Sequence, residues 1–411
     1  MPRPFDIVVA GAGLIGTAAA CLFARQGLDV ALVETQPADR GRGHENSDRR
    51  ISAINVAAAA LLRALEVWPG GAPGRIGDYR AMRVWDRNSP AKISFHAADL
   101  GEPCLGYIID NRLMIALMRE KLRQNYNVTI LDNTEITAID RRGDRAPDRS
   151  HPGLSVDLSG ERIETRLLVG ADGAHSRVRA LCGLSARRRD FGQDALISTV
   201  STARSHRHTA WQCFLETGPV AMLPLADGRC ALVWSCERAT ADRLMDLPTA
   251  DFCARLQSVF FDELGEIADC QPRQRFALHQ HHANPYIADA VALVGDAAHT
   301  IHPLAGLGAN IGLMDAAALA EVVQQARGRG ADPGQYSVLR RYQRWRRGDN
   351  ALVVAMTAGF KEVFGSSRTS VKALRCAGMN LADSITPLKV VLARFATGLS
   401  GDLPALCRRH V

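Results

Sequence analysis

Three glycines near the N-terminus have the spacing that brings a peptide backbone close to phosphate. Gly11, Gly13 and Gly16 form a Gly-x-Gly-x-x-Gly segment, and Glu34 follows 18 residues after the last of them. In dinucleotide sites the first glycine makes a tight turn, the second admits the pyrophosphate and the third lets helix and strand pack closely. The acid accepts hydrogen bonds from ribose hydroxyls. Because an acid here favours a ribose without phosphate, the segment predicts FAD or NAD.

The elements around these glycines are those that such a site needs. Residues 5–10 are an apolar run expected of a buried parallel strand, a helix-like pattern follows, and a second apolar run ends at Glu34. Leu14 and Ile15 would open that helix, whose free N–H groups attract phosphate. Residues 7–24 are uncharged, but their glycines and the acid that follows indicate a strand, turn and helix rather than a membrane span.

Two later carboxylates also follow apolar, strand-like runs. Asp172 lies in the stretch from Thr165 to Gly183, and Asp296 follows Gly295 directly after another such run. A simple NAD dehydrogenase has no use for two further turns so far downstream, whereas the long ribityl-isoalloxazine half of FAD does. The turns therefore favour FAD, with Asp296 accepting hydrogen bonds from ribityl hydroxyls. The alternative is that Asp296 only caps the next turn.

A glycine-rich bend and a predicted helix follow Asp296. The bend would let the chain pass close to the flavin ring, where a Cβ could clash, and a proline would stiffen the approach. The helix, predicted to begin near residue 310, would aim its positive end at the ring and stabilise the reduced cofactor. The predicted contacts here are Gly295, Pro303, Gly306, Leu307, Gly308, Ala309 and Asn310.

Composition and charge fit a folded protein of two or more domains. The chain has 411 residues, of which 47% are hydrophobic and 23% charged, and this length exceeds what a single core usually supports. The net charge of +7 is spread along the chain. No nucleic-acid-reading module accompanies it, so we expect no nucleic-acid partner. Ten cysteines without a Cys-x-x-Cys pair favour a reducing, cytoplasmic compartment.

Together the three turns resemble the fingerprints of flavoprotein aromatic hydroxylases of the para-hydroxybenzoate hydroxylase type. Within that class the chain is similar, over nearly its whole length, to the ubiquinone-biosynthesis hydroxylase family. The matching segments are SDRRISAINVAAAALLRALEVWP (47–69), GYIIDNRLMIAL (106–117) and HPLAGLGANIGLMD (302–315). One position departs from the family signature, because Leu307 stands where glutamine is usual.

The motif placements and the resemblance imply an α/β fold. We expect a GR2-type Rossmann-like FAD-binding domain with an inserted antiparallel β-sheet substrate domain and a C-terminal helical segment. The FAD-binding domain would be discontinuous, over residues 1–75, 106–183 and 286–330. Residues 76–105 and 184–285 would form the substrate domain, a lid over the flavin, and residues 331–411 the helical segment.

The resemblance also implies an activity and its partners. NAD(P)H would reduce FAD, O2 would add to give a flavin C4a-hydroperoxide, and one oxygen would pass to a polyprenylated phenol or quinol ring. The flavin carries this chemistry, so no catalytic side chain is assigned, and Arg50 and Arg112 are implied as cofactor contacts. Such a lipophilic substrate suggests association with the inner face of the cytoplasmic membrane and with other ubiquinone-pathway proteins.

Two other functions stay open at this point. The chain could hydroxylate another aromatic compound, such as a small phenol. It could also bind flavin and prenylated intermediates as an accessory protein without turnover, and the Leu307 departure is the feature that suggests it.

The histidines do not predict a metal site. His299 and His302 lack further ligands at metal spacing, so we expect loop histidines hydrogen-bonded to backbone. We also expect His279, His281 and His282 on a surface strand. Asp315 is expected to be an exposed helix residue or an ion-pair partner rather than a flavin ligand.

Overall fold

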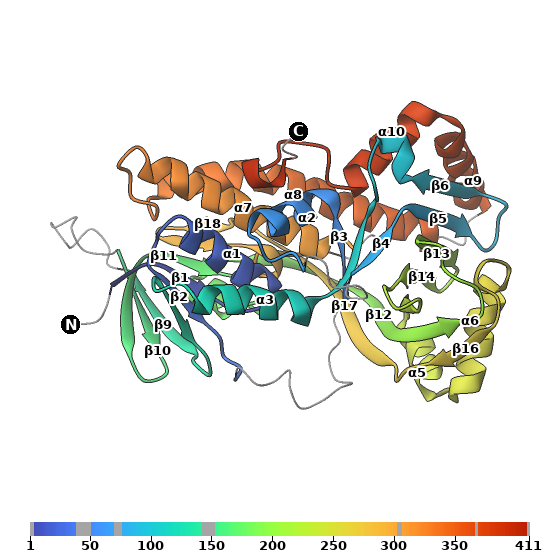
Figure 1. Ribbon diagram of the computed structural model, residues 1–411, viewed down its shortest axis with the longest axis horizontal. Helices are drawn as coiled ribbons and strands as arrows, with labels where there is room; N and C mark the ends of the chain where they lie inside the picture. Colours follow the sequence, from blue (N-terminus) through green and yellow to red (C-terminus); the bar gives the residue numbers. More distant parts are fainter. Residues whose placement is uncertain are drawn as a thin grey trace.

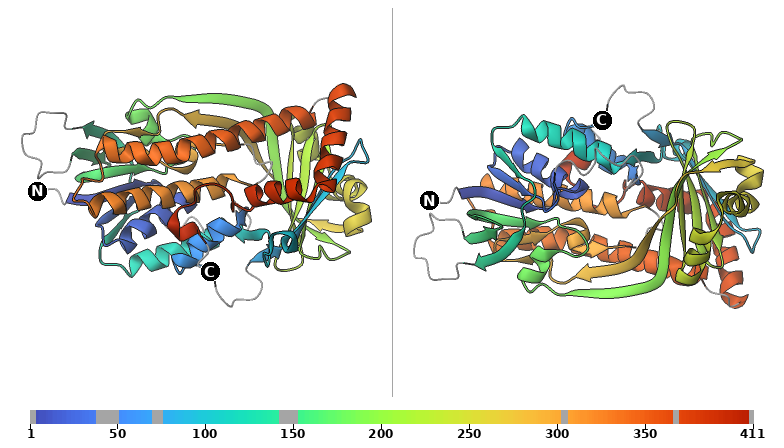
Figure 2. Two further views of the ribbon diagram at one scale, coloured as in Figure 1. Left: turned by 90° about the horizontal axis from the view of Figure 1, so that it is seen from above. Right: turned by 90° about the horizontal axis from the view of Figure 1, so that it is seen from below.

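Two large β-sheets divide the molecule along its long axis, and a long helix runs beside both of them (Figures 1 and 2). That helix is α8 (Tyr336–Gly365). The computed structural model describes residues 4–37, 51–69, 76–141, 153–301, 306–365 and 369–408.

The first sheet is largely parallel and forms the core of one half. Its order is β18-β19-β11-β1-β2-β8, and the run from β19 to β8 is parallel. Antiparallel β10 and β9 extend it beside β11. Its central strands are buried on both faces, which explains their continuous apolar runs. The bounds are β1 (Pro4–Ala10), β2 (Val30–Val33), β8 (Val128–Leu131), β9 (Ile136–Arg141), β10 (Leu154–Leu158), β11 (Arg162–Gly170), β18 (Ile287–Ala288) and β19 (Val291–Leu293).

Three helices accompany this sheet. They are α1 (Leu14–Arg25), α3 (Asn111–Arg123) and α7 (Gly308–Arg327), and α1 contacts both of the others. Fully buried Ala18, Ala19 and Ala20 let these helices approach α1 closely. Helix α7 begins at Gly308, two residues before the predicted start, so its first turn includes the second glycine of the bend.

The second sheet forms the other half and is mostly antiparallel. Its order is β20-β17-β12-β15-β14-β13-β5-β6, with β16 beside β12. The pair β13 and β5 is parallel, which departs from the antiparallel expectation. These two strands come from distant segments, so no hairpin fixes their relative direction. The bounds are β5 (Ala81–Asp86), β6 (Lys92–His96), β12 (Ala186–Thr202), β13 (Thr209–Leu215), β14 (Gly218–Pro224), β15 (Cys230–Glu237), β16 (Ile267–Cys270), β17 (Gln274–Ala283) and β20 (His299–Thr300).

Helices cover one face of the second sheet. Its other face points toward the half of the molecule that is built on the first sheet. Trp211, Trp234 and their neighbours pack with Phe252 and Phe260 in one apolar cluster. Those two phenylalanines belong to α6 (Thr249–Leu264), which follows α5 (Arg238–Asp246). Strand alternation therefore turns the intervening side chains of β12 to β15 toward the half built on the first sheet.

A small sheet joins the two halves. It has the order β3-β7-β4, with β3 (Ile51–Asn55), β7 (Gly106–Asp110) and β4 (Gly77–Tyr79), and α2 (Val56–Ala64) follows β3. Strand β4 thus lies outside the large antiparallel sheet, although we assigned residues 76–105 to that domain. Conversely, β20 joins the large sheet from within the predicted FAD-binding range. The α/β fold class predicted from the sequence is confirmed.

The C-terminal segment is helical, as predicted. After α8 come α9 (Thr369–Ser384), α10 (Thr386–Ala396) and a short 3-10 turn. Figure 1 shows α9 and α10 beside β5 and β6, where the buried Arg375 of α9 pairs with Asp86. Over the residues described, no helix is both long enough and apolar enough to cross a bilayer.

Candidate active site

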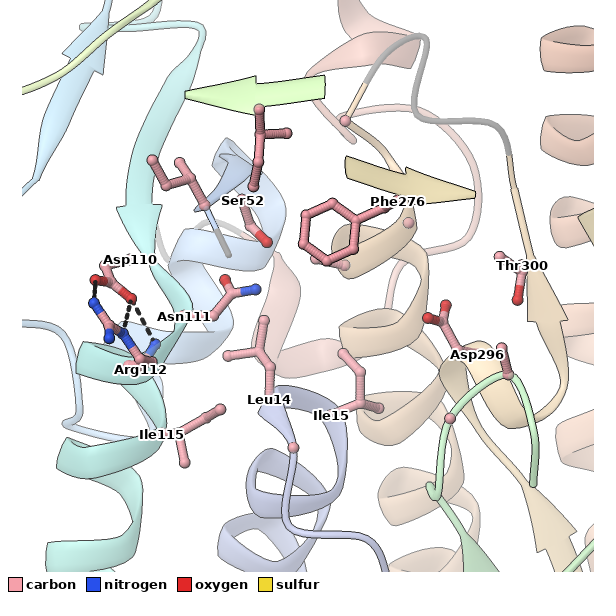
Figure 3. Close-up of a pocket in the computed structure, with 18 of the residues that line it drawn as sticks. Leu14, Ile15, Ser52, Asp110, Asn111, Arg112, Ile115, Phe276, Asp296 and Thr300 are labelled. Atoms are coloured by element: carbon pink, nitrogen blue, oxygen red, sulfur yellow. Dashed lines mark hydrogen bonds and ion pairs between the residues drawn. The ribbon is translucent and has the colours of Figure 1, made fainter. Parts of the chain in front are cut away.

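A cavity of about 2350 Å³ lies between the two halves. Its first wall consists of the glycine turn, the end of β2, the first residues of β3, and the start of α3 and α7. Its second wall is the uncovered face of the antiparallel sheet. Figure 3 shows the ring of Phe276 from the second wall extending in the direction of Ser52 of the first. The glycine turn and the apolar face of the antiparallel sheet therefore line the same cavity.

The glycine turn has the geometry that phosphate binding requires. Gly11 has φ +95°, and a Cβ on it would lie 2.6 Å from the carbonyl oxygen of Ala171. A Cβ on Gly16 would lie 1.8 Å from the carbonyl oxygen of Gly11, so this glycine permits the close contact of turn and helix. Gly13 differs, since a Cβ there would meet nothing within 4 Å and would stand in the cavity. The open space lies where the pyrophosphate is expected at the helix N-terminus.

Two predicted carboxylates line the same wall. Glu34 Oε2 accepts a hydrogen bond from the Ala12 N–H at 2.7 Å, which holds the acid beside the glycine turn. Asp172 also lines the cavity, but its oxygens accept from Ser176 Oγ (2.6 Å) and Val178 N–H (3.0 Å). Asp172 therefore holds the first turn of the helix that follows, α4 (Arg177–Leu181), whose N-cap is Ser176.

Asp296 and the start of the helix that follows also belong to the first wall. Asp296 is exposed in a short 3-10 turn and points toward the cavity, beside Thr300 (Figure 3). Gly306, Gly308 and Ala309 also line the cavity. A Cβ on Gly306, whose φ is +59°, would lie 3.0 Å from Ala53 Cβ, so this bend passes close to β3.

Asn310 fixes the bend to β3. Its Oδ1 accepts from the Asn55 N–H at 2.8 Å, and its Nδ2 donates to the carbonyl oxygens of Ala53 (2.7 Å) and Gly306 (3.0 Å). The side chain is buried, and its hydrogen bonds all go to the protein backbone. The side chain of Asn310 thus holds two backbone segments together, and a cofactor contact at this residue stays a prediction.

A network of buried charged side chains holds the turn that carries Gly295 and Asp296. Asp315 of α7 is fully buried and pairs with His299 and with Arg346 Nε at 3.0 Å. It also accepts from Asn350 Nδ2 (2.9 Å) and the Gly295 N–H (3.2 Å). Burial opposes ionisation of Asp315, but the charge and hydrogen bond of His299, with Arg346 and Asn350, outweigh it and lower the pKa of this carboxyl.

One expectation about this network is confirmed in its second alternative, and one was wrong. Asp315 is an ion-pair partner, as one alternative held, but it is not exposed. His299 lies in β20 and pairs with a carboxylate instead of a loop backbone. Long-range packing of α7 against α8 brings these groups together.

The second wall is built from small and apolar side chains. Gln212, Ala221, Val233 and Ile197 are successive register partners across β13, β14, β15 and β12, and all of them line the cavity. Small residues in the middle of the sheet leave width for a bulky apolar molecule. The carboxylates among the described lining residues belong to the first wall.

Comparison with known proteins decides the family. Residues 5–354 match the model of the FAD binding domain. The chain is 36% identical to ubiquinone hydroxylase UbiL of Rhodospirillum rubrum, over 98% of this chain and 92% of that protein. It is 32% identical to the 3-demethoxyubiquinol 3-hydroxylase of Escherichia coli, over 97% and 99%. The chain belongs to the ubiquinone-biosynthesis hydroxylase family.

Solved structures show the same fold. PqsL of Pseudomonas aeruginosa matches with a TM-score of 0.76 and 23% identity, over 92% of this chain and 99% of that one. The p-nitrophenol 4-monooxygenase PnpA of Pseudomonas putida matches with a TM-score of 0.74 and 21% identity, over the whole of both chains. Membership of the family confirms an FAD-dependent monooxygenase that uses NAD(P)H as reductant.

Leu307, the departure from the family signature, does not face the cofactor cavity. Its side chain is buried in a cluster with Ile301, Ile311, Val353 and Val354. The side chain of Leu307 thus packs toward α8, and a cofactor contact at this residue stays a prediction. The feature that suggested a flavin-binding accessory protein thus lies behind the cavity wall.

The remaining predicted site residues divide into three groups. Arg112 lines the cavity at the start of α3, where its Nη2 pairs with Asp110 Oδ2 at 3.1 Å (Figure 3). Gly295, like Gly16, has a packing role, since a Cβ on it would lie 3.1 Å from Ile15 Cγ1. Arg50 and Pro303 lie outside the described residues.

Three residues near the cavity were missed or misplaced by the sequence reasoning. Phe276 lines it without belonging to a fingerprint, and Thr300 lines it from within the third fingerprint although it was not among the predicted contacts. His281 was expected on a surface, but it is buried next to Arg179 and Thr300. Ala283, two residues further along β17, is apolar and faces inward on the same side of the strand.

Proposed function

We propose that this protein hydroxylates the ring of a polyprenylated phenol or quinol on the route to ubiquinone. The observation that carries the proposal is the shared cavity, in which the FAD fingerprints face a wall of small, apolar side chains. The names of the relatives, ubiquinone hydroxylase and 3-demethoxyubiquinol 3-hydroxylase, support the same substrate class.

The residues present fit FAD. A tight glycine turn, an open Gly13 and an acid beside it form a cradle for the adenosine and pyrophosphate. We propose that the flavin half extends toward Asp296 and the start of α7. The proposed contacts are Gly11, Gly13, Leu14, Ile15, Glu34, Arg112, Asp172, Asp296, Gly306, Gly308 and Ala309.

The chain's own part in the reaction is to bind, orient and shield. Bound FAD supplies the electron transfer and oxygen activation. The apolar second wall, with Ile197, Val233 and Phe276, would keep water from the reacting ring. Gln212 and Ser235 on the same wall offer polar atoms that could orient a ring hydroxyl. The N-terminus of α7 adds positive potential where the reduced cofactor gathers negative charge.

The proposal is tested in cells and with the purified protein. Cells lacking this protein should accumulate a prenylated quinone precursor short of one oxygen, measured by mass spectrometry. The FAD-loaded protein should consume NAD(P)H faster with a prenylated phenol than with the same phenol without its tail. An unchanged quinone pool, or equal stimulation by both phenols, would favour a hydroxylase of small aromatics. Bound FAD with no stimulated turnover would favour the accessory function.

We also propose that the C-terminal helices rest on the membrane that holds such a substrate. Leu374, Leu381 and Val391 of α9 and α10 are 74%, 56% and 61% exposed, and the basic Arg394 in the last turn of α10 is exposed as well. Exposed apolar and basic side chains together suit an anionic bilayer surface. The protein should sediment with anionic vesicles, and a variant with glutamate at the three apolar positions should stay in the supernatant. Equal sedimentation of both would contradict this proposal.

A further inference from the structure

A buried arginine and a buried histidine lie directly behind the cavity wall. Arg179 of α4 and His281 of β17 are 5% and 4% exposed. Arg179 Nη1 lies 3.3 Å from His281 Nε2 and also donates to the carbonyl oxygen of Ala297 at 2.7 Å. Its Nη2 donates to the carbonyl oxygen of Ala174 at 2.8 Å. The guanidinium is therefore anchored between the second and third turns, with one N–H aimed at the imidazole.

This contact determines which imidazole nitrogen carries the proton. A guanidinium can only donate, so Nε2 of His281 must accept. In a neutral imidazole the proton then resides on Nδ1. Burial, together with the positive charge of Arg179, lowers the pKa of His281 to about 4, while the nearby backbone of Asp296 partly opposes this shift. His281 is therefore neutral at physiological pH.

The other side of the imidazole faces a hydroxyl on the cavity wall. His281 Nδ1 and Thr300 Oγ1 are 2.9 Å apart, and the two residues are register partners in β17 and β20. Since Nδ1 carries the proton, it donates and Thr300 Oγ1 accepts. The hydroxyl proton of Thr300 must then point elsewhere. Thr300 lines the cavity, and Figure 3 shows it beside Asp296.

We propose that Arg179 and His281 orient the Thr300 hydroxyl so that it donates a hydrogen bond to an acceptor atom on the flavin half of FAD. This inference rests on the proposed placement of the flavin beside Asp296. Asp296 and Thr300 would then be complementary, since the carboxylate accepts from the cofactor and the hydroxyl donates to it. Arg179 and His281 are positioning residues in this scheme, because they act through Thr300.

The first test is FAD binding to the apoprotein of the full chain. The T300V variant keeps the shape of the side chain and removes the donor, so we expect about five-fold weaker FAD binding, which corresponds to ~1 kcal/mol for one neutral hydrogen bond. The matched variant T300S keeps the hydroxyl and should bind FAD as the wild type does. T300A removes the donor without placing a methyl group against His281, and it serves if T300V does not fold.

The reduction potential of the bound flavin locates the acceptor. If the acceptor lies on the pyrimidine edge of the ring, where reduction adds negative charge, T300V should also lower the potential. If it lies on the ribityl chain, binding should weaken with the potential unchanged. Wild-type-like binding by both T300V and T300A would overturn the proposal. Failure of the wild type itself to bind FAD would instead refute the proposed function.

A second test addresses the imidazole. Long-range 1H–15N correlation spectra of histidine-labelled protein, assigned with H281N, should show a neutral His281 with its proton on Nδ1 at pH 7. A proton on Nε2 would reverse the hydrogen bond and overturn the proposal. In an H281F background the T300V substitution should change FAD affinity less than two-fold. A full five-fold change there would mean that His281 does not orient the hydroxyl.

Discussion

Replacing Asp315 by asparagine tests how much the buried charge network around this residue stabilises the fold. Asp315 is fully buried and ties α7 to α8 and to the turn that carries Asp296. Asparagine has nearly the same volume and keeps one acceptor, but it loses the negative charge. Arg346, itself 4% exposed, would then keep its positive charge in the interior without its buried partner.

The expected destabilisation follows from this burial. Removing one member of a buried ion pair lowers the free energy of unfolding by about 3–5 kcal/mol. For a domain of about 150–250 residues each 1 kcal/mol shifts Tm by about 2–4 °C, so D315N should melt roughly 6–20 °C lower.

Asp349 provides a control on the same arginine. Its side chain is 50% exposed and pairs with Arg346 Nη1 at 3.1 Å. An exposed pair contributes ~0–1 kcal/mol, so D349N should melt within a few degrees of the wild type. Thermal unfolding of the apoproteins, followed by circular dichroism at pH 7, compares the three. Equal melting temperatures for D315N and D349N would show that the buried ion pair of Asp315 stabilises the fold no more than the exposed pair of Asp349.

The same network has a predicted pH dependence. The pKa of Asp315 is lower in the folded protein than the usual aspartate value of about 3.9. Its contribution to stability is therefore fully present above that value and is lost as the pH falls through the lower folded pKa. The gap in Tm between the wild type and D315N should be constant near neutrality and shrink below about pH 4. A gap that widened toward acid would contradict the sign of the shift.

Three further substitutions test the site. G13V should weaken FAD binding at least ten-fold, because its side chain would stand in the open space of the turn; G348A, a helical glycine with equally open surroundings, is the control and should leave Kd unchanged. L307Q restores the residue usual in the family, yet it should lower the free energy of unfolding by about 1–3 kcal/mol, because a polar group enters an apolar cluster. Its FAD Kd should stay within two-fold of the wild type, and a large gain in affinity would show that residue 307 does reach the cofactor. A221F should fill the centre of the second wall and raise KM for a prenylated substrate with FAD binding intact, and an unchanged KM would place the substrate elsewhere.

The sequence by itself determined the features that depend on local backbone geometry. A glycine turn after an apolar strand, an acid at the end of the next strand and two later carboxylates after strands predicted where Gly11, Gly13, Glu34 and Asp296 would meet. Parallel strands place their carboxyl ends at one edge, so local patterns suffice to gather such turns. The α/β class and the helical C-terminal segment follow from the same periodic patterns.

Only the tertiary structure decided which way several side chains face. Leu307 turns toward α8, Asp315 is buried, and His281 lies against Arg179 from a segment about a hundred residues away. The parallel pairing of β13 with β5 was equally invisible in the sequence. In each case the deciding contact joins segments far apart in the chain, and neither periodicity nor residue spacing records which distant surface a side chain meets.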